Sequence, residues 1–149
     1  MRFVIAAFVV SAFLLSCNKD KFNTKPALKL DSVNTKVVDK GDALRFTLNV
    51  TDLEGDLTDS MFIYKVVRNC PVGSLKFQYK IPEFPTNKNL DVDIEVGFAY
   101  RNTSLGLPSI PEPQCVNRND SCFFRFVIRD KAGNVSDTVN SAEIVILKP

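Results

Sequence analysis

The sequence predicts an all-β chain, folded as a single antiparallel β-sandwich of about seven strands. Three observations support this prediction. After the polar residues 18–26, several segments have apolar residues at every second position, which is the period of a half-buried strand and not that of a helix. β-branched residues and many of the 12 phenylalanines lie in these segments. Turn residues separate the segments, and residues 27–149 are long enough to bury one core.

The first element is an N-terminal apolar segment that lies outside the sandwich. Arg2 precedes an apolar stretch from Phe3 to Leu15, which is shorter than the roughly 20 residues of a membrane-spanning helix. A basic residue before a short apolar run is typical of a secretory signal peptide. We therefore expect residues 1–16 to be a signal peptide. The alternative, a buried N-terminal helix or strand, would show polar positions in its pattern, and none occurs before Ser11.

The signal ends in Leu14-Leu15-Ser16-Cys17, which resembles the bacterial lipobox. The resemblance implies that Cys17 is acylated, with palmitate as a typical chain, and becomes the mature N-terminus. Two or three acyl chains hold a protein stably on a membrane. Asn18, which is not the aspartate of inner-membrane retention, favours the outer membrane, and CNKDKF is similar to the start of Bacteroidetes lipoproteins. Residues 17–26 would then be the lipidated cysteine and a polar tether.

Seven segments have the pattern of strands. In ALRFTLNVTD, apolar residues at 44, 46, 48 and 50 alternate with polar ones, as in a strand with one buried face. In LDVDIEVGFAY, three acidic residues lie on the solvent-exposed face of the expected strand. The expected strands are residues 27–34, 43–52, 61–67, 75–81, 90–100, 122–130 and 142–147.

The last two strands and the turn between them carry a family resemblance. FRFVIRDKAGNVSDTV, followed by AEIVIL, resembles the last hairpin of bacterial immunoglobulin-like and fibronectin-III-like domains. FTLNVTDLEGDL is similar to the passage from the second to the third strand of such domains. The resemblance implies an immunoglobulin-like sandwich, a fold that hosts many functions. A core tryptophan and a cysteine pair between the second and sixth strands, two signatures of immunoglobulin domains, are absent from the sequence.

Alternating strand directions place the turns at residues 52–59, 82–89 and 131–137 at one end of the sandwich, beside the tether. Asp52, Glu54, Asp56 and Asp130 are expected to converge there. Clusters of carboxylate oxygens suit Ca²⁺, and the D-x-E-G-D spacing resembles a calcium turn. Tight hairpin turns need the same residue types, so the favoured interpretation is that these residues form solvated turns and the protein has no cofactor, with a calcium ion as the alternative.

Three cysteines remain when Cys17 is used for lipid, an odd number for an oxidising compartment. Cys70 follows the third strand, while Cys115 and Cys122 lie before and at the start of the sixth. The third and sixth strands are neighbours in this fold. This favours a bridge from Cys70 to Cys115 or Cys122 over a local Cys115–Cys122 bridge.

The connection between the fifth and sixth strands, residues 101–121, is long for a compact domain, and such loops are usually functional or disordered. Leu105, Leu107 and Ile110 are unusually apolar for a free linker. Either they fold back onto the sandwich edge or they form a docking surface for a partner.

Three Asp-Ser/Thr-apolar triplets resemble the Bacteroidetes O-glycosylation motif. Their acceptor hydroxyls would be those of Ser32, Ser60 and Thr138.

Composition narrows the function. The 19 basic residues balance the 17 acidic ones, which argues against nucleic-acid binding. Histidine is absent, and with it the commonest general base and metal ligand. No G-x-S-x-G, S-x-x-K or zinc spacing occurs. We expect a membrane-anchored, non-catalytic immunoglobulin-like module of the cell envelope that binds an envelope protein or supports a complex. The alternative is a glycan-binding accessory lipoprotein of a polysaccharide uptake system.

Overall fold

Nine strands are present in the computed structural model, which describes residues 23–149 apart from 58, 84 and 86. They are β1 (Ala27–Val33), β2 (Val37–Val38), β3 (Ala43–Asp52), β4 (Ser60–Val67), β5 (Leu75–Lys80), β6 (Leu90–Ala99), β7 (Asp120–Arg129), β8 (Val139–Asn140) and β9 (Ile144–Ile146). Two 3-10 turns, η1 (Pro71–Gly73) and η2 (Thr103–Leu105), interrupt the connections. The predicted signal peptide and Cys17 lie outside the described residues.

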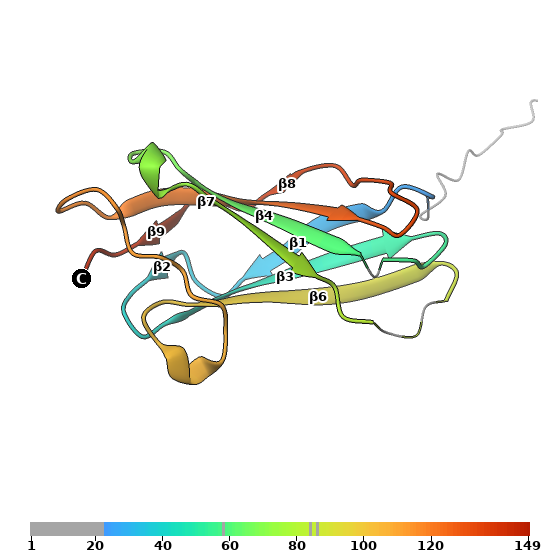
Figure 1. Cartoon of the computed structure of the whole chain (residues 1–149), viewed down its shortest axis with the longest axis horizontal. Coiled ribbons are helices and arrows are strands. Elements are labelled where there is room, and N and C mark those ends of the chain that lie inside the picture. The colour runs from blue at the N-terminus through green and yellow to red at the C-terminus, as the bar shows by residue number, and fades with distance from the viewer. Residues whose placement is uncertain (1–22, 58, 84, 86) are drawn as a thin grey trace, which may run out of the picture.

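The strands form two sheets packed face to face, as Figure 1 shows. One sheet has the order β1-β3-β6, and the other has the order β2-β9-β7-β4-β5 with β8 added to β7. All pairings are antiparallel except that of β2 with β9. The predicted all-β sandwich is therefore confirmed, with β3 and β4 in opposite sheets as in an immunoglobulin-like domain.

Sequence alternation explains the longest strands. In β3, apolar positions 44, 46, 48 and 50 are fully buried and the residues between them are partly exposed. β3 pairs with β6 along its whole length, from Ala43 opposite Ala99 to Asp52 opposite Leu90. This unbroken register makes the β3–β6 pair the main structural unit of the smaller sheet.

Two short strands depart from the prediction of seven. β2 and β8 have two residues each, too few for any alternation to be visible in the sequence. β2 carries the chain from the smaller sheet to the larger one, where it runs parallel to β9. β9 is shorter than its predicted range of 142–147.

Aromatic rings fill the core in place of the missing tryptophan. The ring of Phe46 lies 5.0 Å, centroid to centroid, from the rings of both Phe124 and Phe126. Phe98 contacts Phe77 and Phe124 at 5.2 and 5.7 Å. These rings come from both sheets, so they join the two layers.

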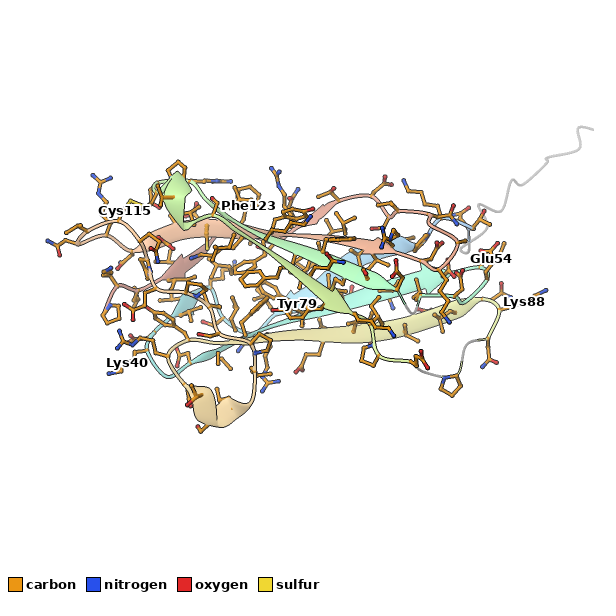
Figure 2. The ribbon with its side chains drawn as sticks, in the orientation of Figure 1. Lys40, Glu54, Tyr79, Lys88, Cys115 and Phe123 are labelled. Carbon is orange, nitrogen blue, oxygen red and sulfur yellow. A yellow bond between two sulfur atoms is a disulfide. The ribbon has the colours of Figure 1, made fainter. Side chains whose placement is uncertain are left out.

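The two ends of the sandwich differ in what they carry. At the tether end, the turns at 53–59, 81–89 and 130–138 lie beside residues 23 and 24, where Leu53 N–H donates to the Asn23 carbonyl at 3.1 Å. At the distal end lie η1, the 101–119 loop and the C-terminus. Figure 2 shows Glu54 and Lys88 at the tether end and Cys115 at the distal end. The predicted distribution of turns is confirmed.

None of the helical segments in the described part of the chain has the length and hydropathy of a membrane-crossing helix.

Candidate functional site

An acidic cluster lies at the tether end. Asp52 is the last residue of β3, Asp56 lies in the following turn, and Asp130 directly follows β7. One carboxylate oxygen from each lies within 4.8 Å of the others. Asp52 and Asp130 are buried and Asp56 is partly buried. The fourth predicted member, Glu54, is outside this group, because it sits at the exposed tip of the turn (Figure 2).

Backbone N–H groups fix the orientation of each carboxylate in this acidic cluster. Asp52 Oδ2 accepts from the N–H groups of Gly55 and Asp56, at 2.7 and 3.2 Å. Asp56 Oδ2 accepts from Ala132 N–H at 3.1 Å, across to the β7–β8 turn. Asp130 accepts from the backbone and side-chain amides of Asn134, at 2.7 and 2.9 Å. The second oxygens, Asp52 Oδ1 and Asp56 Oδ1, are buried and accept no hydrogen bond.

The protonation of Asp52 reflects this environment. Burial raises the pKa of Asp52 above its ordinary value, and the negative charges of Asp56 and Glu54 raise it further. The hydrogen bonds from the Gly55 and Asp56 amides oppose that rise because they stabilise the ionised form. The raised pKa means that ionised Asp52 is held at a cost in this site.

Gly55 sets the shape of the turn between Asp52 and Asp56. Its φ is +73°, and a Cβ added there would lie 2.2 Å from the backbone oxygen of Asn87. Only glycine fits both the left-handed conformation and this close approach. The acidic turn is thus packed against the β5–β6 connection.

An apolar groove of about 260 Å³ lies between β5 and β6. Each is the last strand of its sheet, so their outer backbone edges face this side of the sandwich. Tyr79 and Ile81 line one wall, Ile94 and Val96 line the other, and Leu107 covers one end. Tyr79 is near the middle of the molecule in Figure 2. The groove combines apolar surface with strand edges that have no strand partner among the described residues over most of their length.

The long loop folds back onto the sandwich edge, the first of the two predicted alternatives. Ala99 N–H donates to the Pro108 carbonyl, and Ile110 N–H donates to the Ala99 carbonyl, both at 2.8 Å. Ile110 is 1% exposed, and the Leu107 side chain packs over Gly97. Leu105 remains exposed on η2. The loop therefore does not present the three residues as one apolar surface.

A disulfide joins Cys70 and Cys115 at the distal end, with 6.0 Å between their Cα atoms. This confirms the favoured bridge from Cys70 and selects Cys115 as its partner. Cys122 is free and fully buried, and its Sγ lies 3.4 Å from the Ile144 carbonyl. Cys122 occupies an inward position of β7, which directs its thiol into the core.

A buried ion pair also lies at the distal end, and the sequence did not reveal it. Lys65 Nζ is 2.5 Å from Asp120 Oδ2, and the two side chains are 1% and 0% exposed. Asp120 Oδ1 accepts no hydrogen bond. Lys65 shares the inward face of β4 with Met61, Ile63 and Val67.

The outer face of the larger sheet carries aromatic rings with cations over them. Lys76 Nζ lies 5.1 Å from the ring centroid of Phe62 and 5.6 Å from that of Tyr64. Arg125 lies 5.1 Å from the ring centroid of Phe123. The three rings are half-buried. We call Phe62, Tyr64 and Phe123 the aromatic face.

The three predicted glycan acceptors have different surroundings. Ser32 and Thr138 are exposed. Ser60 is 6% exposed at the start of β4, where its hydroxyl donates to the Asp59 carboxylate at 3.2 Å. The folded protein therefore presents two of these hydroxyls and covers the third.

Comparisons with known proteins find only distant structural similarities. No family model and no curated protein matches the chain. The sporulation control protein Spo0M from Bacillus subtilis is similar at 10% identity, with a TM-score of 0.47 over 84% of this chain and 50% of that one. A β-glucosidase from Listeria innocua is similar at 11% identity, with a TM-score of 0.42 over 82% of this chain and 16% of that one. The CARDB domain of the PF1109 protein from Pyrococcus furiosus, solved with di-metal ions, is similar at 10% identity, with a TM-score of 0.32 over 85% of this chain and 98% of that one. The chain thus spans half of Spo0M and a small part of the glucosidase.

Proposed function

We propose that this protein is a non-catalytic binding module of the cell envelope, held at the outer membrane by lipid on Cys17, and that its partner is an envelope protein. The observation that carries the binding role is the apolar groove between β5 and β6. The lipobox-like Leu14–Cys17 and the polar tether support the anchor. No catalytic group is needed for this role, which agrees with the absence of histidine from the sequence.

The groove suits an extended segment of a partner. An edge strand offers N–H and C=O groups to which a further strand can pair. Side chains at alternate positions of the added strand would then enter the apolar groove, which is how β-augmentation obtains specificity. The partner's contribution is therefore expected to be an extended segment with apolar residues at every second position.

Site-directed photocrosslinking in the native envelope tests this role. A photoreactive amino acid that replaces Lys80, which borders the groove, is expected to capture one partner repeatedly. The same amino acid in place of Lys29 on β1 should not capture it. Leu107→Asp places a charge in the groove and should abolish capture. Leu105→Asp, in the same loop but exposed, is the matched control and should leave it unchanged. Equal capture by both variants would contradict the proposal.

The anchor is tested separately through Cys17. Cys17→Ser removes the thiol that carries the lipid, so the variant is expected to lose acylation and to enter the aqueous phase in a detergent partition. Intact-mass measurement of the wild-type protein should show the acyl chains. A variant that stays in the membrane, together with an uncut and unmodified wild-type chain, would contradict the lipid anchor.

A second candidate function is glycan binding, which the aromatic face favours. Rings provide stacking surfaces for sugars, and the nearby Lys76 and Arg125 would suit acidic glycans. A glycan array probed with the protein separates the two functions. Binding that is lost in Phe123→Ala but kept in Leu107→Asp would support the glycan function and remove the groove as the main site.

A further inference from the structure

No positively charged side chain in the described part of the chain is paired with the acidic cluster at the tether end. Asp52 is fully buried and Asp130 is 1% exposed, so two of its three carboxylates are removed from water. A buried charge is costly unless it is paired or coordinates a metal. Every ion pair found in the described part of the chain joins other side chains. A bound cation would offset the cost of burying these carboxylates.

Unpaired oxygens provide an independent indication of a ligand. Asp52 Oδ1 and Asp56 Oδ1 are buried and accept no hydrogen bond. The other oxygen of each carboxylate is held by a backbone amide, from Gly55 and from Ala132. Buried acceptors are normally satisfied. Carboxylates that are fixed through one oxygen and free at the other are pre-organised as ligands.

We propose that Asp52, Asp56 and Asp130 bind a calcium ion. Calcium lies about 2.3–2.6 Å from its oxygen ligands, so ligands on opposite sides of one ion are roughly 5 Å apart. The three oxygens here lie within 4.8 Å of one another. Zinc favours nitrogen and sulfur ligands, whereas this set offers oxygen alone. Magnesium demands a stricter octahedron and usually keeps several waters, so calcium fits three fixed carboxylates better.

Binding would tie the tether to the sandwich. The three ligands come from the end of β3, the β3–β4 turn and the end of β7, so one ion would join both sheets. Asn134, which holds Asp130, also donates to the Thr24 carbonyl at 3.3 Å. Leu53, next to Asp52, donates to the Asn23 carbonyl. The ion would therefore order the point where the tether leaves the domain, and this role does not depend on the proposed partner.

Calorimetry and thermal unfolding of the full chain in detergent, first freed of divalent ions with a chelator, test the site. Titration with CaCl₂ should show one ion bound per chain, with a dissociation constant on the order of 10⁻⁴ M, as in extracellular calcium modules. Calcium should also raise the unfolding temperature. Asp52→Asn keeps the acceptor for Gly55 N–H but removes one charge, so it should bind calcium at least about tenfold more weakly. Its unfolding temperature in chelator should equal or exceed that of the wild-type protein, because repulsion in the cluster falls.

Glu54→Gln is the matched control, since Glu54 lies in the same turn but outside the cluster. This variant should keep the calcium affinity of the wild-type protein within about twofold. In a separate control on the wild-type protein, MgCl₂ should raise the unfolding temperature less than CaCl₂ does. If Asp52→Asn does not fold, Asp130→Asn tests the same point from the other sheet. A wild-type protein that shows neither binding heat nor a rise in unfolding temperature would overturn the proposal. So would a folded Asp52→Asn or Asp130→Asn variant that binds calcium as the wild-type protein does.

Discussion

The two ends of the sandwich are closed by different forces. At the distal end, the Cys70–Cys115 disulfide joins η1 to the long loop, and the buried Lys65–Asp120 pair joins β4 to β7. At the tether end, the turns meet through backbone hydrogen bonds to three carboxylates of like charge. The distal end is therefore closed by a covalent bond and a pair of opposite charges, whereas at the tether end we expect stability to depend on what neutralises Asp52, Asp56 and Asp130.

The largest effect is expected at the buried ion pair of the distal end. Asp120→Ala leaves the Lys65 ammonium buried without a partner, and breaking such a pair costs about 3–5 kcal/mol. Chemical denaturation should show this loss of unfolding free energy. The double variant Lys65→Met with Asp120→Ala removes both charges and should recover much of the loss. A double variant as unstable as Asp120→Ala alone would show that the charges are not the cause.

Loss of the disulfide is expected to have the next largest effect. The bridge spans a sequence separation of 45 residues, and removing a crosslink of such a length typically costs about 2–4 kcal/mol. The variant with Cys70→Ser and Cys115→Ser should therefore unfold at a lower denaturant concentration. Reductant should lower the stability of the wild-type protein and leave that of this variant unchanged. Equal sensitivity of both to reductant would mean that the bridge does not form in the purified protein.

At the tether end, Gly55→Ala should cost more than Gly41→Ala. Both glycines have positive φ, which strains an alanine by about 1 kcal/mol. Only at Gly55 would the new Cβ also lie 2.2 Å from the Asn87 carbonyl oxygen, and nothing lies within 4 Å at Gly41. We expect a loss of about 2–3 kcal/mol for Gly55→Ala, measured by denaturation. Equal losses would indicate that the acidic turn is not packed against residue 87.

The smallest effect is expected for the reactivity of Cys122, the free thiol of the distal end. Burial raises the pKa of Cys122 to about 12, so at pH 8 the thiol is protonated as well as inaccessible. Iodoacetamide should leave Cys122 unmodified in the folded protein and alkylate it once denaturant is added. Rapid alkylation without denaturant would show that the core opens at this end. The comparison is made on protein with the disulfide intact, so that no other thiol of the domain reacts.

Topology was predictable from the sequence where apolar and polar residues alternate regularly. Residues 43–52 alternate without interruption, and β3 has those bounds. The convergence of Asp52, Asp56 and Asp130 also followed, because alternating strand directions bring their turns to one end. Glu54 was wrongly grouped with them, since spacing within a turn does not tell which side chains point inward.

Features that depend on contacts distant in sequence were not predictable. Lys65 stands in an inward position of an apolar run, but its partner Asp120 is 55 residues away, in what the sequence predicted as loop. β2 consists of Val37 and Val38 and is defined by its pairing to β9, which no local pattern encodes. The choice of Cys115 over Cys122 depended on a loop whose path over β6 is set by tertiary hydrogen bonds.

Hydrogen–deuterium exchange of the full chain, with and without calcium and reductant, tests the difference between the two ends most directly. Calcium should slow exchange of the backbone amides that donate to the acidic cluster and leave the distal end unchanged; these amides are those of Gly55, Asp56, Ala132 and Asn134. Reductant should speed exchange around η1, at Gly73 and Ser74, and leave the tether end unchanged. Calcium that alters neither end, or reductant that alters both ends equally, would contradict the account.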